Sequence, residues 1–183
     1  MKGKKRMGAL LAVAVAAASA ALPGTEALAS YVTAEGGLNV REQPDASSEA
    51  VGFLNYGDEV DVMEYDGEWD RLLSEDGIAY VKSEYVSEED PLDGMEFLGT
   101  WLITAYGATG SPCASGAWPE VGRTVACNSL PFGTRVWIDG VGERVVEDRG
   151  PSSLGSEWLD LYLGDEGACW QWGAPRLNVY LIK

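Results

Sequence analysis

Short apolar, β-branched runs follow one another through most of this chain, and turns rich in Gly, Asp, Asn and Pro separate them. The run 59–63 alternates polar and apolar residues with the two-residue period of a strand. Asp66-Gly67 and Asp139-Gly140 are typical of tight hairpin turns. Only residues 165–172 have a helical pattern, which Gly173-Ala174-Pro175 ends. The pattern predicts an all-β (mainly β) fold of small barrels with one short helix.

The first 29 residues have the organisation of a secretory signal peptide. Basic residues at 2–6 precede the almost purely apolar run 7–22, and Ala27-Leu28-Ala29 is a small-x-small cleavage motif. We therefore expect export and a mature chain that begins at Ser30. The alternative is an uncleaved N-terminal anchor, for which the apolar run is short. No later apolar stretch approaches the length of a membrane span.

The rest of the chain divides at a charged linker that contains Pro and Gly, residues 88–94. Residues 30–87 and 95–183 each contain a separate set of strand-like runs, so we expect two domains. The predicted strands are 31–33, 38–41, 51–54, 59–63, 69–73 and 78–81 in the first domain, and 97–105, 124–127, 134–138, 144–147, 160–163 and 177–182 in the second.

Charge and histidine content exclude several classes of function. The leader holds four basic residues and one acidic residue, so 9 basic and 28 acidic residues remain, a formal net charge of −19. A surface this acidic repels nucleic acids and anionic lipids. The chain has no histidine, which removes Ser–His and Cys–His catalysis and imidazole-based zinc sites. We expect no metal, no cofactor and a monomer.

Two aspartates stand out because they lie within or at the end of apolar strand-like runs. Asp148 closes the run 143–148, and Asp160 lies in the run 159–163. Burying a carboxylate is costly unless it is paired or functional. The Gly/Ser/Pro-rich loop 149–156 joins the runs, so both carboxylates are expected near one mouth. The alternative is that one of them caps the loop through backbone N–H groups.

Several motifs in the first domain resemble those of a bacterial SH3 domain. They are Leu38-Asn39-Val40-Arg41, Val51-Gly52-Phe53-Leu54, Gly57-Asp58-Glu59-Val60, Gly67-Glu68-Trp69 and the run 80–86. The resemblance implies a small SH3-like barrel that binds peptidoglycan or other cell-wall material, or a spacer that positions its neighbour. Ala79 stands where that family usually carries a tryptophan, so we expect weaker ligand contact there.

A second set of motifs follows in order through residues 95–183. They are Ile103-Thr104-Ala105-Tyr106, Ala114-Ser115-Gly116, the runs 122–126 and 130–134, Val146-Glu147-Asp148-Arg149-Gly150, Leu159-Asp160-Leu161-Tyr162, and the runs 168–173 and 179–181. Together they resemble the 3D domain, named for three aspartates and similar to the barrel of membrane-bound lytic transglycosylase A and of stationary-phase survival proteins. The resemblance implies a six-stranded double-psi β-barrel.

The same resemblance implies a peptidoglycan lytic transglycosylase, secreted or associated with the cell wall, that cleaves the MurNAc–GlcNAc bond of glycan strands. Asp160 is the expected acid/base, because its apolar neighbours favour the protonated form. Asp148 is expected beside it, orienting the sugar or stabilising the developing cation. The residues expected to contact the saccharide are Asn128, Thr104, Tyr106, Ser115 and Trp158.

One departure from the family pattern leaves the activity open. Asn128 stands where the family has its first aspartate. An amide can hydrogen-bond a sugar hydroxyl but cannot carry a proton in transit. Asn128 is therefore either a positioning residue or the mark of a weakened enzyme. The alternative function is a non-catalytic protein that binds cell-wall glycan in a retained groove, while a peptidase or amidase is disfavoured by the missing histidine.

Three cysteines, Cys113, Cys127 and Cys169, leave an odd thiol in a chain expected to be exported. Thiols that can meet tend to oxidise outside the cell. A Cys113–Cys127 disulfide with Cys169 free is the favoured pairing, and the two other pairings remain open.

Overall fold

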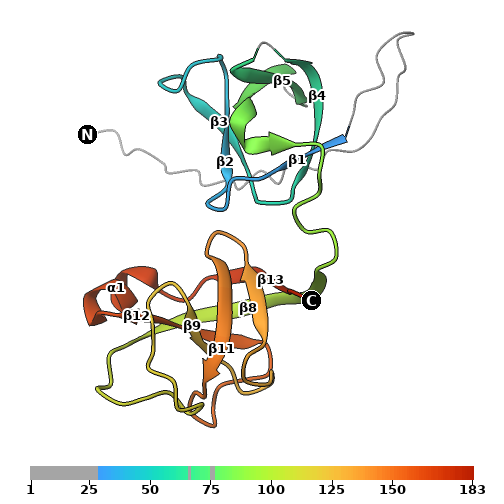
Figure 1. Ribbon diagram of the computed structural model, residues 1–183. Helices are drawn as coiled ribbons and strands as arrows, with labels where there is room; N and C mark the ends of the chain where they lie inside the picture. The colour runs from blue at the N-terminus through green and yellow to red at the C-terminus, as the bar shows by residue number, and fades with distance from the viewer. Residues whose placement is uncertain (1–28, 66, 75–76) are drawn as a thin grey trace, which may run out of the picture. The chain divides into compact units, whose positions relative to one another are not determined.

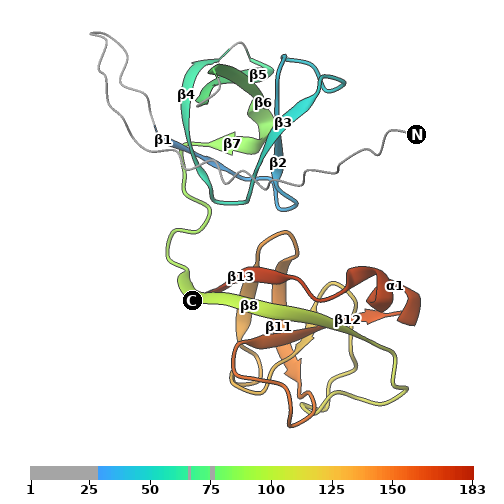
Figure 2. The same ribbon diagram turned by 180° about the vertical axis from the view of Figure 1, so that it is seen from behind.

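The computed structural model describes residues 29–65, 67–74 and 77–183 (Figures 1 and 2). The predicted signal peptide, residues 1–29, lies outside the described residues except for Ala29. The chain divides into two compact units between Pro91 and Leu92. This division falls within the stretch predicted as the linker.

The first unit is a seven-stranded antiparallel sheet with the order β3-β2-β6-β5-β4-β1-β7. Six of its strands are those predicted from the two-residue periodicity, and a short 3-10 turn, η1, leads into β7. The elements are β1 (Ala29–Val32), β2 (Leu38–Arg41), β3 (Ala50–Leu54), β4 (Glu59–Tyr65), β5 (Trp69–Ser74), β6 (Gly77–Lys82), η1 (Ser83–Tyr85) and β7 (Val86–Ser87).

The core of the first unit contains aliphatic side chains from several of its strands, with Val32 and Val81 fully buried. Ala79 belongs to this core and is 1% exposed. Its side chain therefore faces the interior and offers a ligand almost no surface, and the expected weaker ligand contact at Ala79 stays a prediction.

The second unit is a closed barrel of six strands in the order β10-β11-β9-β12-β8-β13. The pairs β11–β9 and β12–β8 are parallel, and the other four are antiparallel. The long strand β8 runs along β12 and β13 (Figure 2). The strands are β8 (Glu96–Gly107), β9 (Thr124–Ala126), β10 (Arg135–Ile138), β11 (Gly142–Asp148), β12 (Trp158–Gly164) and β13 (Arg176–Leu181).

The barrel interior is filled by alternate residues of its strands, as the pleat requires. All six strands contribute, and most of these side chains have no exposed surface. The buried cluster consists of Trp101, Ile103, Val125, Cys127, Val136, Ile138, Val146, Leu159, Leu161 and Val179.

Helix α1 (Glu166–Trp172) lies over β8 and β12. Asp165 is its N-cap, and the Asp165 side chain accepts a hydrogen bond from the Ala168 N–H. Gly173, with φ of 73°, ends the helix. The Trp172 indole N–H donates to the Ile103 carbonyl at 3.0 Å, which fixes the helix to β8.

These elements confirm the predicted mainly β fold, with an SH3-like unit, a closed six-stranded barrel and one short helix. The double-psi path of the chain through the barrel stays a prediction. No helix in residues 29–65, 67–74 or 77–183 has the length and hydropathy needed to cross a membrane.

Candidate active site

Asp148 and Asp160 lie on opposite sides of strand β9, level with the same residue. Asp148 on β11 and Asp160 on β12 are both register partners of Ala126. Because neighbouring strands are about 4.8 Å apart, the two aspartate Cα atoms are separated by about 10 Å. Thr104 on β8 is the register partner of Asp160. The four residues form one row across the barrel wall, which we call the aspartate row.

The aspartate row lies on the face of the sheet opposite the core. Ile103, Val125 and Leu159, each adjacent to a member of the row, are fully buried in the barrel interior. Since successive side chains of a strand point to opposite faces, the row faces outward. Asp160 and Thr104 are accordingly half-buried rather than interior.

Asp148 reaches this face through an irregularity in β11. Val146 pairs with Val125 and points into the core, and the next register pair joins Asp148 to Ala126. The register thus skips Glu147, which forms a β-bulge. In a regular strand Asp148 would share the face of Val146, so the bulge is what turns its carboxylate outward.

The Asp160 carboxylate has a defined partner on one oxygen. The Trp158 indole N–H donates to Thr104 Oγ1 at 2.7 Å, and the Thr104 hydroxyl lies 2.6 Å from Asp160 Oδ1. Because an indole N–H can only donate, the Thr104 proton is directed to Oδ1. Within the described residues Oδ2 has no hydrogen-bond partner, which leaves that oxygen for a proton or a ligand.

Burial raises the pKa of Asp160, and the negative charge of Asp148 adds to the rise, while the Thr104 hydrogen bond opposes it. The predicted direction is therefore confirmed. Leu159 and Leu161 face the core rather than the carboxylate. Among the sequence neighbours of Asp160, Trp158 is the one that lies close to the carboxylate, through their common partner Thr104.

Asp148 accepts hydrogen bonds through both its carboxylate and its backbone carbonyl. Its Oδ1 accepts from the N–H groups of Ala114 and Arg149, both at 2.8 Å, and its Oδ2 accepts from the Tyr106 hydroxyl at 3.1 Å. Its backbone carbonyl accepts from the Cys127 N–H at 3.1 Å. The loop-capping alternative thus describes part of its role, since both N–H donors to Oδ1 belong to loops. These contacts give Asp148 one fixed orientation.

Tyr106 connects the row to a second aromatic residue. Its ring lies 5.3 Å from that of Tyr162, centroid to centroid, at an interplanar angle of 58°. Burial, followed by the Asp148 charge and hydrogen bond, raises the pKa of Tyr106 well above its usual range. The phenol therefore stays protonated and acts as a hydrogen-bond donor to Asp148.

Two of the predicted saccharide contacts, Asn128 and Ser115, also hold loops, and their contact with saccharide stays a prediction. Asn128 Nδ2 donates to the carbonyls of Pro151 and Leu154 at 3.0 and 3.4 Å, and its Oδ1 accepts from the Gly150 N–H at 3.2 Å. Ser115 Oγ accepts from the Ala117 N–H at 3.4 Å within its own turn. The amide at 128 therefore has a structural use that a carboxylate cannot provide, because two of its three contacts need a donor.

The tryptophans fall into two groups. Trp137 is buried, and the indole N–H groups of Trp158 and Trp172 are engaged by Thr104 and Ile103. Trp118 and Trp170 are 68% and 86% exposed. Trp118 follows the turn whose Ala114 N–H donates to Asp148.

The predicted Cys113–Cys127 disulfide is not formed, because all three cysteines are free thiols. Alternation along and beyond β9 turns Cys127 into the barrel core, where it is fully buried. Cys113 lies on the outer loop, where burial and then the charges of Asp148 and Glu147 raise its thiol pKa. The two side chains thus lie on different sides of the barrel wall.

Sequence reasoning did not assign a role to two neighbours of the row. Arg149 Nη1 donates to the Cys127 carbonyl, and its guanidinium lies 3.7 Å from the Phe132 ring centroid. Glu147 is buried and binds Arg123 and Thr124. The sequence could have pointed to Glu147, because it is another carboxylate in the same apolar run as Asp148. No group of three His, Cys, Asp or Glu side chains suited to a metal ion occurs in the described parts of the chain.

The first unit has a separate open groove of about 390 Å³. Arg41 and Lys82 line it, together with Trp69 and Tyr85. Lys82 lies 4.8 Å from the Trp69 ring centroid and forms an ion pair with Glu68. The groove therefore combines aromatic and cationic groups in a strongly acidic chain.

Comparison with known families identifies one domain. Residues 36–87, which span β2 to β7, match the bacterial SH3 domain. The chain therefore carries this domain, a type found in cell-wall-associated proteins. No curated protein and no solved structure matches the chain. The family match does not reach the barrel, so the resemblance of residues 95–183 to the 3D domain stays a prediction.

Proposed function

We propose that this is an exported, cell-wall-associated protein whose barrel cleaves the MurNAc–GlcNAc bond of peptidoglycan as a lytic transglycosylase. The observation that carries the proposal is the setting of Asp160. Its carboxyl is half-buried, its pKa is raised by burial, and Oδ1 is fixed by Thr104. Oδ2 is the oxygen left to carry a proton outward.

One carboxyl group with these properties is sufficient for lytic cleavage. Protonated Asp160 donates its proton to the glycosidic oxygen as the C1–O bond breaks, and positive charge develops at the anomeric carbon. The resulting carboxylate accepts the proton of the C6 hydroxyl, whose oxygen closes the 1,6-anhydro ring. The proton given up is thus regained, and no water is consumed.

Asp148 supplies the second requirement, a fixed negative charge near the developing cation. Its carboxylate is held by Ala114, Arg149 and Tyr106, so it needs no rearrangement when the cation forms. It lies two strands from Asp160, on the same face of the sheet. The same charge helps to keep Asp160 protonated in the resting protein.

The SH3-like unit supports the cell-wall setting of this activity. Residues 36–87 match a domain typical of cell-wall-associated proteins. We assign it the retention of the protein on the wall, with the groove at Arg41, Lys82 and Trp69 as its candidate contact surface. The glycan chemistry is assigned to the barrel alone.

A non-catalytic glycan-binding protein is the second candidate. The observation that favours it is Asn128, which carries no charge and is engaged by the loop at 150–154. In that case Asp148 and Asp160 bind sugar hydroxyl groups as acceptors, and bond cleavage is absent.

Digestion of purified sacculi by the mature protein in water labelled with heavy oxygen distinguishes these functions. A lytic transglycosylase releases 1,6-anhydro-muropeptides that are lighter than hydrolysis products by one water and carry no label. A hydrolase releases labelled reducing ends. Binding of the protein to sacculi without any released fragment assigns the non-catalytic function and refutes lytic cleavage.

A further inference from the structure

We propose that Glu147 is the positioning residue of the candidate active site: its clamped carboxylate holds the β-bulge that turns Asp148 outward, onto the row that contains Asp160. This inference rests on the proposed function for its effect on catalysis, while its effect on Asp148 is measurable without any activity. Glu147 is not itself expected to touch the substrate.

The bulge is an unusual feature at this place. It interrupts the pairing of β11 with β9, which is parallel, and bulges are rare in parallel pairs. The extra residue is Glu147, and the residue that follows it is Asp148. Removal of the bulge would return Asp148 to the core-facing position two residues after Val146. The candidate site therefore depends on how the bulge is held.

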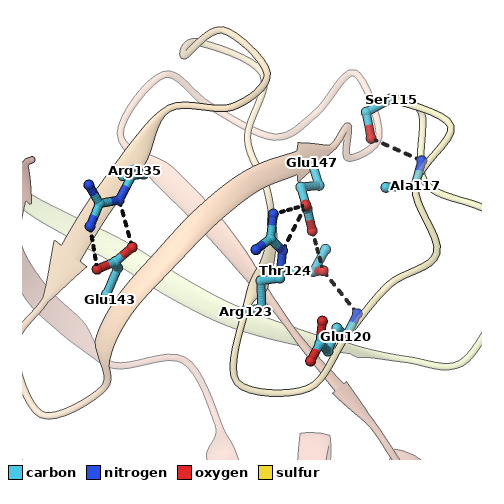
Figure 3. Close-up of polar contacts among 8 residues, drawn as sticks. All are labelled: Ser115, Ala117, Glu120, Arg123, Thr124, Arg135, Glu143 and Glu147. Carbon is cyan, nitrogen blue, oxygen red and sulfur yellow. Dashed lines mark hydrogen bonds and ion pairs between the residues drawn. The ribbon is translucent and has the colours of Figure 1, made fainter.

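The side chain of Glu147 is clamped from the segment that leads into β9 (Figure 3). Its Oε1 accepts from Arg123 Nε and Nη2 at 2.9 and 2.8 Å, and its Oε2 accepts from Thr124 Oγ1 at 2.7 Å. Thr124 Oγ1 in turn accepts from the Glu120 N–H at 2.9 Å. Both carboxylate oxygens are thus engaged, and the strand partner of the bulge supplies one of the donors.

The backbone of the bulge is tied to the same loop that binds Asp148. The Glu147 carbonyl accepts from the Ser115 N–H at 3.1 Å, and Asp148 Oδ1 accepts from the neighbouring Ala114 N–H at 2.8 Å. These consecutive N–H groups bind consecutive residues of β11. A shift of Glu147 therefore moves the 113–117 turn and removes a donor from Asp148.

The environment of Glu147 indicates that its negative charge has a structural role. The residue is 9% exposed. Its burial alone would raise the pKa, but the hydrogen bonds from Arg123 and Thr124 and the Arg123 charge outweigh burial and lower it. The carboxylate therefore stays ionised and bound, in contrast to the acid expected at Asp160.

Glu143, which lies on β11 like Glu147, and its partner Arg135 on β10 provide a matched comparison. They form a bidentate pair with N–O distances of 2.7 and 2.8 Å, and their side chains are 52% and 43% exposed. Figure 3 shows this pair apart from the Glu147 cluster. Glu143→Gln thus removes the same charge from β11 without touching the bulge.

The dependence of the rate on pH distinguishes an effect of Glu147 on the orientation of Asp148 from an effect on the stability of the fold. The titratable groups that face Asp160 are Asp148 from β11, Tyr106 from β8 and Cys169 from α1, and β9 contributes only Ala126 there. Glu147 is not among them, so its charge acts on Asp160 only through Asp148. If Asp148 turns away, the pKa of Asp160 falls, and the basic limb of the rate profile moves to lower pH.

The test compares Glu147→Gln with Glu143→Gln in the mature protein. We expect Glu147→Gln to lower kcat about tenfold with KM nearly unchanged, and to move the basic limb to lower pH. Alkylation of Cys113, followed by mass spectrometry of its peptide, should become at least about threefold faster, because the 113–117 turn loosens. Cys127 is the internal reference, and Glu143→Gln should match the wild type in every measurement.

Cys113 alkylation and carbon NMR titration of the aspartate carboxyls need no turnover. If the wild type proves inactive on every glycan, the proposed function fails, yet these two measurements still decide whether Glu147 positions Asp148. A folded Glu147→Gln protein with unchanged Cys113 alkylation and unchanged Asp160 titration overturns the inference. Should Glu147→Gln not fold, Thr124→Val, which removes the donor to Oε2 together with the acceptor of the Glu120 N–H, is measured with the same criteria.

Discussion

Glu147 and Asp160 are two carboxylates of one barrel wall, and their surroundings give them opposite properties. Glu147 has donors on both oxygens and a guanidinium beside it, and its pKa is lowered. Asp160 has one hydroxyl partner and a like charge across β9, and its pKa is raised. Since burial acts in the same direction on both, the hydrogen-bond partners decide the outcome. The difference distinguishes a carboxylate that holds the fold from one suited to proton transfer.

The largest expected effect is the loss of turnover when Asp160 is substituted. Asp160→Asn keeps the shape and the contact with Thr104 but cannot exchange a proton. Release of anhydro-muropeptides should fall at least about a hundredfold, the low end for loss of a general acid. Asp165→Asn is the matched control, because asparagine also caps helix α1 and this residue lies outside the aspartate row. Full activity in a folded Asp160→Asn protein would refute the assignment.

A smaller loss is expected at Asp148. Asp148→Asn preserves an acceptor for the N–H groups of Ala114 and Arg149 but removes the charge. We expect turnover to fall about tenfold, less than the loss of a donor aimed at the reacting oxygen, because Asp148 lies two strands from Asp160. The pKa of Asp160 should fall because the neighbouring negative charge is lost. The basic limb of the pH–rate profile should therefore move to lower pH. An unchanged basic limb would mean that the charge of Asp148 does not influence the acid/base residue.

Sequence patterns predicted every strand except β7, because most of the runs alternate or are mainly apolar and β-branched. The apolar runs also drew attention to Asp148 and Asp160, and the resemblance to the 3D domain added Thr104 and Tyr106. The register and hydrogen bonds bring these four residues into one outward-facing region. The Glu147 bulge was not predictable in this way. Glu147 and Asp148 are both acidic, so a shift of one residue leaves the polar pattern of β11 unchanged.

The role of Asn128 was not predictable for a different reason. An amide in a sequence shows neither which groups its two N–H bonds reach nor what its oxygen accepts. The Pro151 and Leu154 carbonyls become its partners only when the loop returns over the end of β9. The Cys113–Cys127 disulfide failed similarly, because sequence proximity does not show which side of the wall each thiol faces.

The substitution of Asn128 by aspartate is expected to lower the stability of the fold. Asn128→Asp replaces a donor with an acceptor oxygen facing the carbonyls of Pro151 and Leu154. We expect the free energy of unfolding to fall by about 0.5–1.5 kcal/mol at neutral pH, the net contribution of an ordinary hydrogen bond, because Asn128 is exposed. Chemical denaturation measures it. Asn178→Asp is the control, since Asn178 Oδ1 accepts from Thr100 Oγ1, and a carboxylate does the same.

The carboxyl of Asp160 should also oppose stability once it ionises. Its pKa is raised in the folded protein, so the folded state binds more protons than the unfolded state between the two pKa values. The free energy of unfolding should therefore fall as pH rises through that window. Asp160→Asn should lack this fall and be more stable than the wild type at neutral pH. Equal stability of the two proteins across the window would mean that the ionised carboxylate is not disfavoured.

The smallest expected effects are on thermodynamic stability, in a comparison of Glu147→Gln with Glu143→Gln. Glu143 is exposed, so its substitution should change the free energy of unfolding by at most about 0.5 kcal/mol. Glu147→Gln should cost about 1–3 kcal/mol, because a buried, hydrogen-bonded charge is replaced by a neutral group that leaves a donor or acceptor mismatched. The pKa of Glu147 is lowered in the folded protein, so its contribution is present above the unfolded pKa and is lost as pH falls through the folded value. The gap between the two variants should therefore be widest at neutral pH and close in acid, as denaturation at a series of pH values measures. A gap that persists in acid would assign the cost to packing and not to the clamped charge.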